Sequence, residues 1–283
     1  MQSQGRKITW LTCYDYSFAT ILDSTDLDMI LVGDSGGMVM FGYETTVPVT
    51  MDEMISISKS VRVGAPNKFI VGDMPKGSYE VNNEEAIRNA MRFVKEAGCD
   101  AVKLEGGVNM SARIKAIVDS GISVVGHIGL TPQSATSLGG YRVIGRDQSE
   151  LKSLLIDGKA IQDAGAFAVL VEAAPPSVAK ELKNIVNLLV LGIGSGANVD
   201  GQLLILHDLL GIYPNFRPKF AKCYVPDVMD DFLKSLEALS EKEVDKNFTN
   251  KDGIHALSKM CVDKFINEVR NLEFPSVDYS YKE

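Results

Sequence analysis

The stretch "MILVGDSGG", residues 29–37, shows the pattern from which the fold follows. Its first part is a short apolar run, which is typical of a buried strand. The run ends on Asp34, and a buried carboxylate costs free energy unless a partner stabilises it. The glycines that follow allow a tight turn or the close approach of a ligand. The pattern therefore indicates that the Asp34 carboxylate has a binding partner, which remains to be identified.

Runs of this kind recur along the chain, with helical patterns between them. Helical periodicity is found, for example, in residues 51–64, 83–98 and 149–165. Alternating strands and helices predict parallel strands joined by helical crossovers, and eight such units predict closure into a (β/α)8 TIM barrel. An open doubly wound sheet is the alternative. The predicted strands are residues 8–15, 29–34, 68–73, 101–106, 123–129, 168–174, 187–195 and 202–208.

Two segments depart from the regular repeat. Only "GANVDG", residues 196–201, separates the last two predicted strands, which is too short for an ordinary crossover helix. Either this connection is degenerate or one of the two strands is wrongly predicted. From about residue 225 the pattern is helical and longer than one closing helix requires. We expect a single barrel domain over residues 1–283 with a helical extension from about 225, packed on the barrel or on another subunit.

The composition limits the classes of partner. The 283 residues are 45% hydrophobic and carry a net charge of -8, which allows a large core and argues against a nucleic-acid surface. No apolar run reaches the roughly 18 residues of a membrane span, and the first residues lack the apolar core of a signal peptide. The four cysteines have no C-x-x-C spacing, which predicts reduced thiols. We expect a cytoplasmic protein with a small-molecule ligand, and neither a nucleic-acid nor a membrane partner.

Polar side chains stand at or next to the carboxyl ends of the predicted strands. Barrel active sites are assembled at that end from several strands, so we expect a converging ring of side chains. For any one acid, capping of the following helix is the alternative. The ring would consist of Asp15, Asp34, Asp73, Glu105, His127, Glu172 and Asp208.

Alternation within residues 101–105 places Lys103 and Glu105 on one face of a strand, toward the barrel interior. Lys103 is then either a functional cation or a structural partner of Glu105. Crowded carboxylates repel one another unless a cation neutralises them, and oxygen ligands without His or Cys suit Mg²⁺. The sequence therefore predicts Mg²⁺ held by two or three acids, with positions open for a chelating substrate.

Glu172 lies in the apolar segment "AVLVEAAPP", where burial would raise its pKa toward that of a useful general base. A buried Glu bonded to backbone amides is the alternative. His127 is either a ligand-contacting residue or a core histidine, whereas His207 and His255 are expected to be structural. Residues 138–146, "LGGYRVIGR", are expected to form a mobile loop over the site.

The order and spacing of several motifs resemble the ketopantoate (3-methyl-2-oxobutanoate) hydroxymethyltransferases of pantothenate and coenzyme A biosynthesis. The resemblance covers about residues 7–224. It rests on "LTCYDYSFA", "LVGDSGGMVMFGYETTVPVTMDEM", "VRVGAPN", "GDMPKGSY", "AVKLEGG", "GHIGLTPQS", "LGGYRVIGR" and "DGQLLILHDLLG". Gly36, where the family usually has a bulkier residue, and the "EAAPP" segment depart from the family pattern.

This resemblance implies a barrel of the phosphoenolpyruvate mutase and isocitrate lyase superfamily, usually assembled as a decamer. It implies transfer of a hydroxymethyl group from 5,10-methylenetetrahydrofolate to 3-methyl-2-oxobutanoate through a Mg²⁺-stabilised enolate. The implied roles are a magnesium site of Asp34, Asp73 and Glu105, ketoacid contacts from Asp34, Ser35, Asp73 and Lys103, stabilisation of the enolate by Lys103, and Glu172 as general base.

Two other classes of function remain open at this point. A sister enzyme that breaks a carbon-carbon or carbon-phosphorus bond would use the same metal, but many such relatives carry a Cys in a gating loop. None of the four cysteines has that setting. A non-catalytic barrel that serves as a scaffold would not need the acids together with Lys103.

Overall fold

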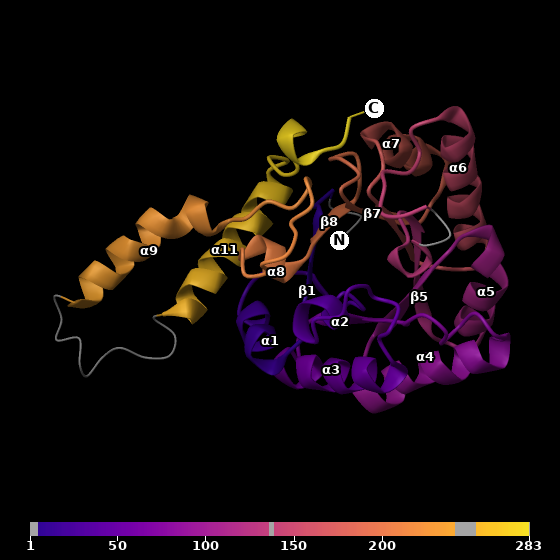
Figure 1. Cartoon of the computed structure of the whole chain (residues 1–283), viewed down its shortest axis with the longest axis horizontal. Helices are drawn as coiled ribbons and strands as arrows, with labels where there is room; N and C mark the ends of the chain where they lie inside the picture. Colours follow the sequence, from indigo (N-terminus) through magenta and orange to yellow (C-terminus); the bar gives the residue numbers. More distant parts are fainter. Residues whose placement is uncertain (1–4, 136–138, 241–252, 283) are drawn as a thin grey trace.

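The computed structural model describes residues 5–135, 139–240 and 253–282. Its centre is a closed barrel of parallel strands, shown in Figure 1. The first and last strands pair directly, with Ile8 opposite Gly201, so the barrel prediction is confirmed and the open sheet is wrong. The strands are β1 Ile8–Thr12, β2 Met29–Val32, β3 Phe69–Asp73, β4 Ala101–Glu105, β5 Ser123–Gly129, β6 Ala168–Glu172, β7 Leu189–Ile193 and β8 Gly201–Leu204.

Helices surround the barrel, and several of them begin at a side chain that caps them. Thr50 and Glu53 form a capping box at α3, and Asn82 accepts a hydrogen bond from the Glu85 amide at α4. Such caps satisfy backbone N–H groups that have no partner within the helix. The helices of the barrel are α1 Tyr16–Asp23, α2 Gly36–Met40, α3 Met51–Gly64, α4 Asn83–Ala97, α5 Ser111–Asp119, α6 Gln148–Asp163, α7 Pro176–Ile185 and α8 Leu206–Leu209. Short 3-10 turns are η2 Val108–Met110, η3 Pro132–Ser134 and η4 Val277–Tyr279.

Along each strand, successive side chains point alternately toward the helices and into the interior of the barrel. A Cβ atom on Gly72 would lie 2.3 Å from Phe93 of α4, and one on Gly126 would lie 2.7 Å from Ile161 of α6. These glycines therefore face the helices, and the next residues, Asp73 and His127, face the interior.

The connection between β7 and β8 contains no helix, so the degenerate crossover is confirmed. Asp200 replaces the missing helix as the anchor of this connection. Its carboxylate accepts hydrogen bonds from Lys183 Nζ at 2.7 Å and from the Val190 amide at 2.9 Å. The eighth predicted strand was too long, because residues 206–209 form the short helix α8.

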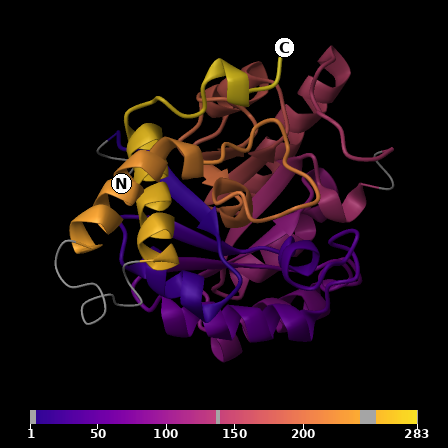
Figure 2. The ribbon, with the colours of Figure 1, turned by 60° about the vertical axis from the view of Figure 1, so that its left-hand side comes forward.

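Two further helices, α9 Val225–Ser240 and α11 Ile254–Arg270, follow the barrel. They contact each other on one side of the molecule, and α11 packs on β1 and α1 (Figures 1 and 2). Tyr224 is fully buried beside Phe265 and donates a hydrogen bond to Glu268 at 3.0 Å. The helical extension thus begins where it was expected. Among the described helices none is both long and apolar enough to cross a bilayer.

Candidate active site

A cavity of about 620 Å³ opens at the carboxyl end of the barrel strands. It contains side chains from β3, β4, β5 and β6 and from the turn after β2. The structure thus brings together residues that are far apart in the sequence, as barrel active sites require. The predicted site residues that line this cavity are Asp34, Ser35, Asp73, Lys103, Glu105, His127, Glu172 and Asp208.

Lys103 forms a buried ion pair with Asp73. The distance from Lys103 Nζ to Asp73 Oδ1 is 2.8 Å, and both side chains are at most 3% exposed. Burial raises the pKa of Asp73 to about 7, against the attraction of Lys103. Burial alone would lower the pKa of Lys103, but the surrounding charges of Asp73, Asp34 and Glu105 outweigh it and raise this pKa. Lys103 therefore pairs with Asp73 rather than with Glu105, the partner considered from sequence.

Gln133, in η3, connects the acids to one another. Its Nε2 group donates to Asp34 Oδ2 at 2.9 Å, and its backbone amide donates to Glu105 Oε2 at 3.1 Å. The Tyr79 hydroxyl donates to Gln133 Oε1 at 2.6 Å and fixes the orientation of the amide. The sequence reasoning missed Gln133, although it lies in the quoted motif "GHIGLTPQS". The sequence did contain a signal for it, because Gln133 is a polar residue that follows shortly after the strand of His127.

His127 lies between Lys103 and Glu172. Its Nδ1 is 3.2 Å from Lys103 Nζ, and its Nε2 is 3.2 Å from Glu172 Oε2. Burial, followed by the charge of Lys103, holds the pKa of His127 well below its usual range, so the ring is neutral at pH 7. Because Nδ1 faces an ammonium group, it acts as the acceptor and the proton resides on Nε2, toward Glu172.

Glu172 ends β6 and keeps 16% of its side chain exposed to the cavity. Burial raises its pKa to about 8, while Lys103 lowers it and Asp34 raises it further. Within the described part of the chain, no backbone amide donates a hydrogen bond to its carboxylate. This environment favours a general base over a structural Glu172, because hydrogen bonds from backbone amides to the carboxylate would lower its pKa.

The other predicted site residues, Asp15, Asp208 and Ser35, differ in whether they reach the cavity and in what they contact. Asp15 does not line the cavity, because its carboxylate accepts a hydrogen bond from the Phe18 amide at 2.9 Å and caps α1. Its place in the ring was therefore wrong. Asp208 lines the cavity from α8 and not from a strand end. Ser35 Oγ is 2.8 Å from the Tyr14 hydroxyl, and a Cβ on Gly36 would lie 2.9 Å from the Tyr14 ring. The Tyr14 ring thus occupies the space beside Gly36.

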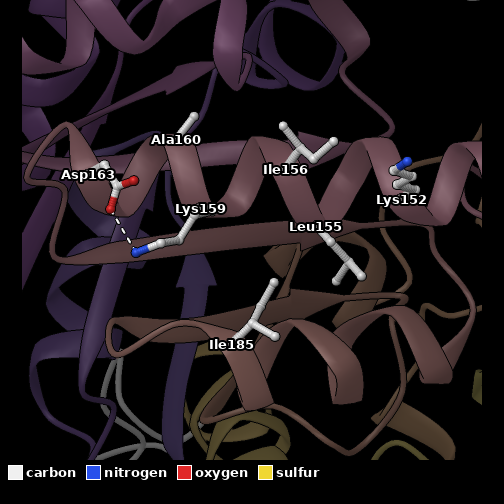
Figure 3. Close-up of a pocket in the computed structure, with 7 residues that line it drawn as sticks. All are labelled: Lys152, Leu155, Ile156, Lys159, Ala160, Asp163 and Ile185. Carbon is white, nitrogen blue, oxygen red and sulfur yellow. Dashed lines mark hydrogen bonds and ion pairs between the residues drawn. The ribbon is translucent and has the colours of Figure 1, made fainter.

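The predicted loop over the site lies partly outside the described residues, because residue 138 is not described. Tyr141, Arg142 and Val143, from the rest of this loop, line the cavity. A second hollow, of about 440 Å³, lies on the outer surface between α6 and α7 (Figure 3). There Lys159 pairs with Asp163 at 2.8 Å, and the acids of the central cavity are absent from its lining.

Comparison with known proteins identifies the family. The model of the ketopantoate hydroxymethyltransferase family matches residues 1–251. The chain is 50% identical to the 3-methyl-2-oxobutanoate hydroxymethyltransferase of Heliobacterium modesticaldum over 79% of this chain and 81% of that protein. It is 42% identical to the enzyme of the same name from Moorella thermoacetica over 100% of this chain and 95% of that protein. The chain belongs to the ketopantoate hydroxymethyltransferase family.

Structures of similar fold place this family among known barrels. Phosphonopyruvate hydrolase, solved with oxalate and Mg++, has a TM-score of 0.59 and 12% identity, covering 95% of this chain and 96% of that one. A 2,3-dimethylmalate lyase, a member of the PEP mutase/isocitrate lyase superfamily, has a TM-score of 0.55 and 14% identity, covering 94% and 93%. These structures share the barrel fold predicted from the sequence, and the family membership makes the chain a hydroxymethyltransferase enzyme.

The ketopantoate hydroxymethyltransferase site has the donor chemistry that Mg²⁺ requires. Asp34, Asp73 and Glu105 offer oxygen ligands, and burial with mutual repulsion raises the pKa of Glu105 well above its usual range. A divalent cation would relieve that repulsion. In the described residues, however, no three acids, histidines or cysteines are already arranged around one point. Lys103 and Gln133 hold two of these carboxylates, Asp73 and Asp34, in their present positions.

Proposed function

We propose that this enzyme transfers a hydroxymethyl group from 5,10-methylenetetrahydrofolate to 3-methyl-2-oxobutanoate, giving 2-dehydropantoate in pantothenate and coenzyme A biosynthesis. The observation that carries the proposal is the convergence of three acids, Lys103 and Glu172 on one cavity in a chain of this family. A small ketoacid needs a carboxylate site, a polarised carbonyl and a base near C3, and these residue types supply all three.

The metal is the first component of the proposal. Asp34, Asp73 and Glu105 would hold Mg²⁺, which when bound polarises the keto carbonyl of the substrate as a Lewis acid. The fold neighbour phosphonopyruvate hydrolase, solved in complex with oxalate and Mg++, supports this assignment at the level of the fold. Oxalate, like the ketoacid, presents two neighbouring oxygens to a cation.

The residues of the chain then perform orientation and proton transfer. Ser35, at the start of α2, orients the substrate carboxylate, and its hydroxyl is positioned by Tyr14 at 2.8 Å. The Lys103 ammonium stabilises the negative charge that develops on the keto oxygen. Glu172 removes the C3 proton, and the neutral His127 ring lies beside it, with Nε2 at 3.2 Å from Glu172 Oε2.

The transfer itself follows from the enolate. C3 forms a bond to the one-carbon unit, whose bonds to the folate nitrogens break, and water supplies the hydroxyl oxygen. The products are 2-dehydropantoate and tetrahydrofolate. A bond-breaking relative with a gating Cys finds no support, because Cys13, Cys99 and Cys261 are buried and no cysteine lines the described cavity.

The direct test is an assay of 2-dehydropantoate formation from 3-methyl-2-oxobutanoate and 5,10-methylenetetrahydrofolate. We expect turnover with Mg²⁺ and its loss after treatment with a chelator. Turnover that persists in chelator would contradict the metal assignment, and no product in the presence of Mg²⁺ would contradict the proposed reaction.

We further propose that the enzyme is cytoplasmic and assembles as a homo-oligomer, as a decamer if it follows the resemblance. Ile156 and Ile185, which are 51% and 46% exposed beside the hollow of Figure 3, support an apolar contact with another copy. Sedimentation should show a species many times the 30.8 kDa chain. A clean monomer at micromolar concentration would contradict this assembly.

A further inference from the structure

The cavity has an outer part that the proposed ketoacid chemistry does not use. Its volume of about 620 Å³ lies in the range of about 300–1,000 Å³ that proteins use for drug-sized ligands, and a small branched ketoacid fills only a fraction of it. The acids and Lys103 belong to the strand ends. The aromatic part of the lining comes from loops and from the C-terminal segment. We call it the aromatic rim: Tyr141, Tyr213, Phe216, Phe220 and Tyr281.

The aromatic rim is assembled by contacts between distant parts of the chain. The rings of Phe220 and Tyr281 meet edge to face with centroids 6.1 Å apart. Lys219 donates a hydrogen bond to the Ser280 carbonyl at 2.7 Å, which ties the C-terminal segment to the loop after α8. In Figure 2 this segment (yellow) lies above the orange loops. The C-terminal segment therefore contributes directly to the wall of the cavity.

Part of the rim is more exposed than such side chains usually are. Phe216 is 68% exposed and Tyr141 is 54% exposed, although both line the cavity. Large apolar side chains grouped at the mouth of a cavity are typical of surfaces that bind a ligand. Flat aromatic ligands suit them best, because rings stack on rings in offset or edge-to-face arrangements.

A buried carboxylate faces the same cavity and has no role in the ketoacid chemistry. Asp208 is 5% exposed, and in the part of the chain that the structure describes no hydrogen bond reaches its carboxylate. Burial raises the pKa of Asp208 to about 6, against the attraction of Arg217. Because Asp208 lines the cavity, its carboxylate is within reach of a ligand, and N–H groups of that ligand would form charge-assisted hydrogen bonds with it.

We propose that the aromatic rim and Asp208 form the subsite for the ring system of the one-carbon donor. The inference rests on the proposed function, which makes the donor a reduced folate. The pyrimidine edge of a folate carries neighbouring N–H groups, which match the two oxygens of one carboxylate. Its flat ring and benzoyl group offer faces for stacking on the rim. A folate therefore satisfies both features, whereas the ketoacid satisfies neither.

The test measures the affinity for tetrahydrofolate by calorimetry, with Mg²⁺ and 3-methyl-2-oxobutanoate present. Phe216→Ala should weaken binding about 5- to 100-fold, the range found when one stacked ring is removed. Asp208→Asn should weaken it about tenfold or more, because the amide turns a donor toward the donors of the ring. Phe69→Ala is the matched control: Phe69 is 38% exposed at the opposite end of β3, and its loss should leave binding unchanged.

A second measurement separates this inference from the proposed function. Exchange of the C3 proton with solvent deuterium, without folate, reports only on the ketoacid. If Phe216→Ala and Asp208→Asn bind tetrahydrofolate as tightly as the wild type, or lose exchange as strongly as they lose folate affinity, the subsite assignment is overturned. If the wild type forms no 2-dehydropantoate and binds no tetrahydrofolate, the proposed function itself fails. Weakened folate binding in both variants, with a raised KM for the methylene donor in a wild type that turns over, supports the subsite.

Discussion

Neighbouring strands of the barrel use the acids near their carboxyl ends in different ways. After β2 and β3, Asp34 and Asp73 point into the cavity, where Gln133 and Lys103 hold them. After β1, which ends at Thr12, Asp15 turns away and caps α1. The difference teaches that a carboxylate at a strand end binds the donor that the local chain brings within reach.

The start of the next helix explains the difference between Asp15 and Asp73. Asp34 also lies close to a following helix, α2, but its carboxylate accepts a hydrogen bond from Gln133. Helix α1 begins at Tyr16, directly after Asp15, so its free backbone N–H groups are at hand. After Asp73 the next helix begins only at Asn83, and the nearest donor is the Lys103 ammonium on the neighbouring strand. The first arrangement stabilises the fold, whereas the second leaves buried charges that a ligand can use.

The largest expected effect is the loss of a cavity acid. Asp34→Ala should reduce turnover by more than about 100-fold and weaken Mg²⁺ binding, because it removes a predicted ligand; substitutions behind such ligands already cost about 10- to 100-fold. Turnover and calorimetric Mg²⁺ titration measure the two effects, and circular dichroism checks the fold. Wild-type turnover in Asp34→Ala would show that Asp34 and the helix-capping Asp15 do not differ in function.

Glu172→Gln tests the base separately from the metal. The amide is nearly isosteric and leaves the predicted ligands intact, so ketoacid and Mg²⁺ should still bind. Deuterium exchange at C3 and turnover should fall together by about 10²- to 10⁴-fold, as is usual for a positioned general base. Exchange at the wild-type rate would assign Glu172 a structural role and make His127 the next candidate.

Much of the fold and part of the site could be predicted from the sequence. The alternation of strand and helix patterns predicted the barrel, and the periodicity within one strand predicted that Lys103 and Glu105 face its interior. The sequence could not show that Asp15 caps a helix. An acid between a strand and a helix gives the same pattern whether it caps the helix or points into the cavity. Gln133 and Tyr281 depended on tertiary contacts. Gln133 reaches Asp34 across 99 positions of sequence separation, and Tyr281 arrives through the return of the C-terminal segment. No local pattern encodes such distances.

Gln133→Ala should have a smaller effect than either acid variant. The side chain contacts Asp34 rather than the predicted reacting atoms, so its removal loosens a carboxylate without removing it. We expect a 10- to 100-fold loss of Mg²⁺ affinity, as is typical when a group behind a metal ligand is removed. Gln133→Glu, measured beside it, should be worse, because a further charge would face Asp34. Unchanged Mg²⁺ affinity in both variants would contradict a supporting role for Gln133.

The raised pKa of Glu172 predicts a pH dependence. Only the ionised form accepts a proton, so exchange at C3 should rise about tenfold per pH unit below a pKa near 8 and level off above it. Exchange that is already level from pH 5.5 upward would show that Glu172 titrates normally.

The stability of the fold should change with pH in the opposite sense to the exchange rate. Because the folded pKa exceeds the usual 4.5, ionisation opposes folding as the pH rises from about 4.5 through 8. Glu172→Gln should therefore be more stable than the wild type above pH 8.

The smallest expected effect comes from the acid that follows β1. Asp15→Ala removes the cap of α1, which should lower the free energy of unfolding by about 1 kcal/mol, as is typical for an Asp cap. Asp15→Asn or Asp15→Ser, which can still accept the Phe18 amide hydrogen bond, should recover most of this loss. Turnover and Mg²⁺ affinity should stay at wild-type values in all three variants, because Asp15 does not line the cavity. Urea unfolding beside the activity assay measures both quantities. If Asp15→Ala instead lost turnover at unchanged stability, Asp15 would act in the site as Asp73 does, and the position of the next helix would not explain the difference between these two acids.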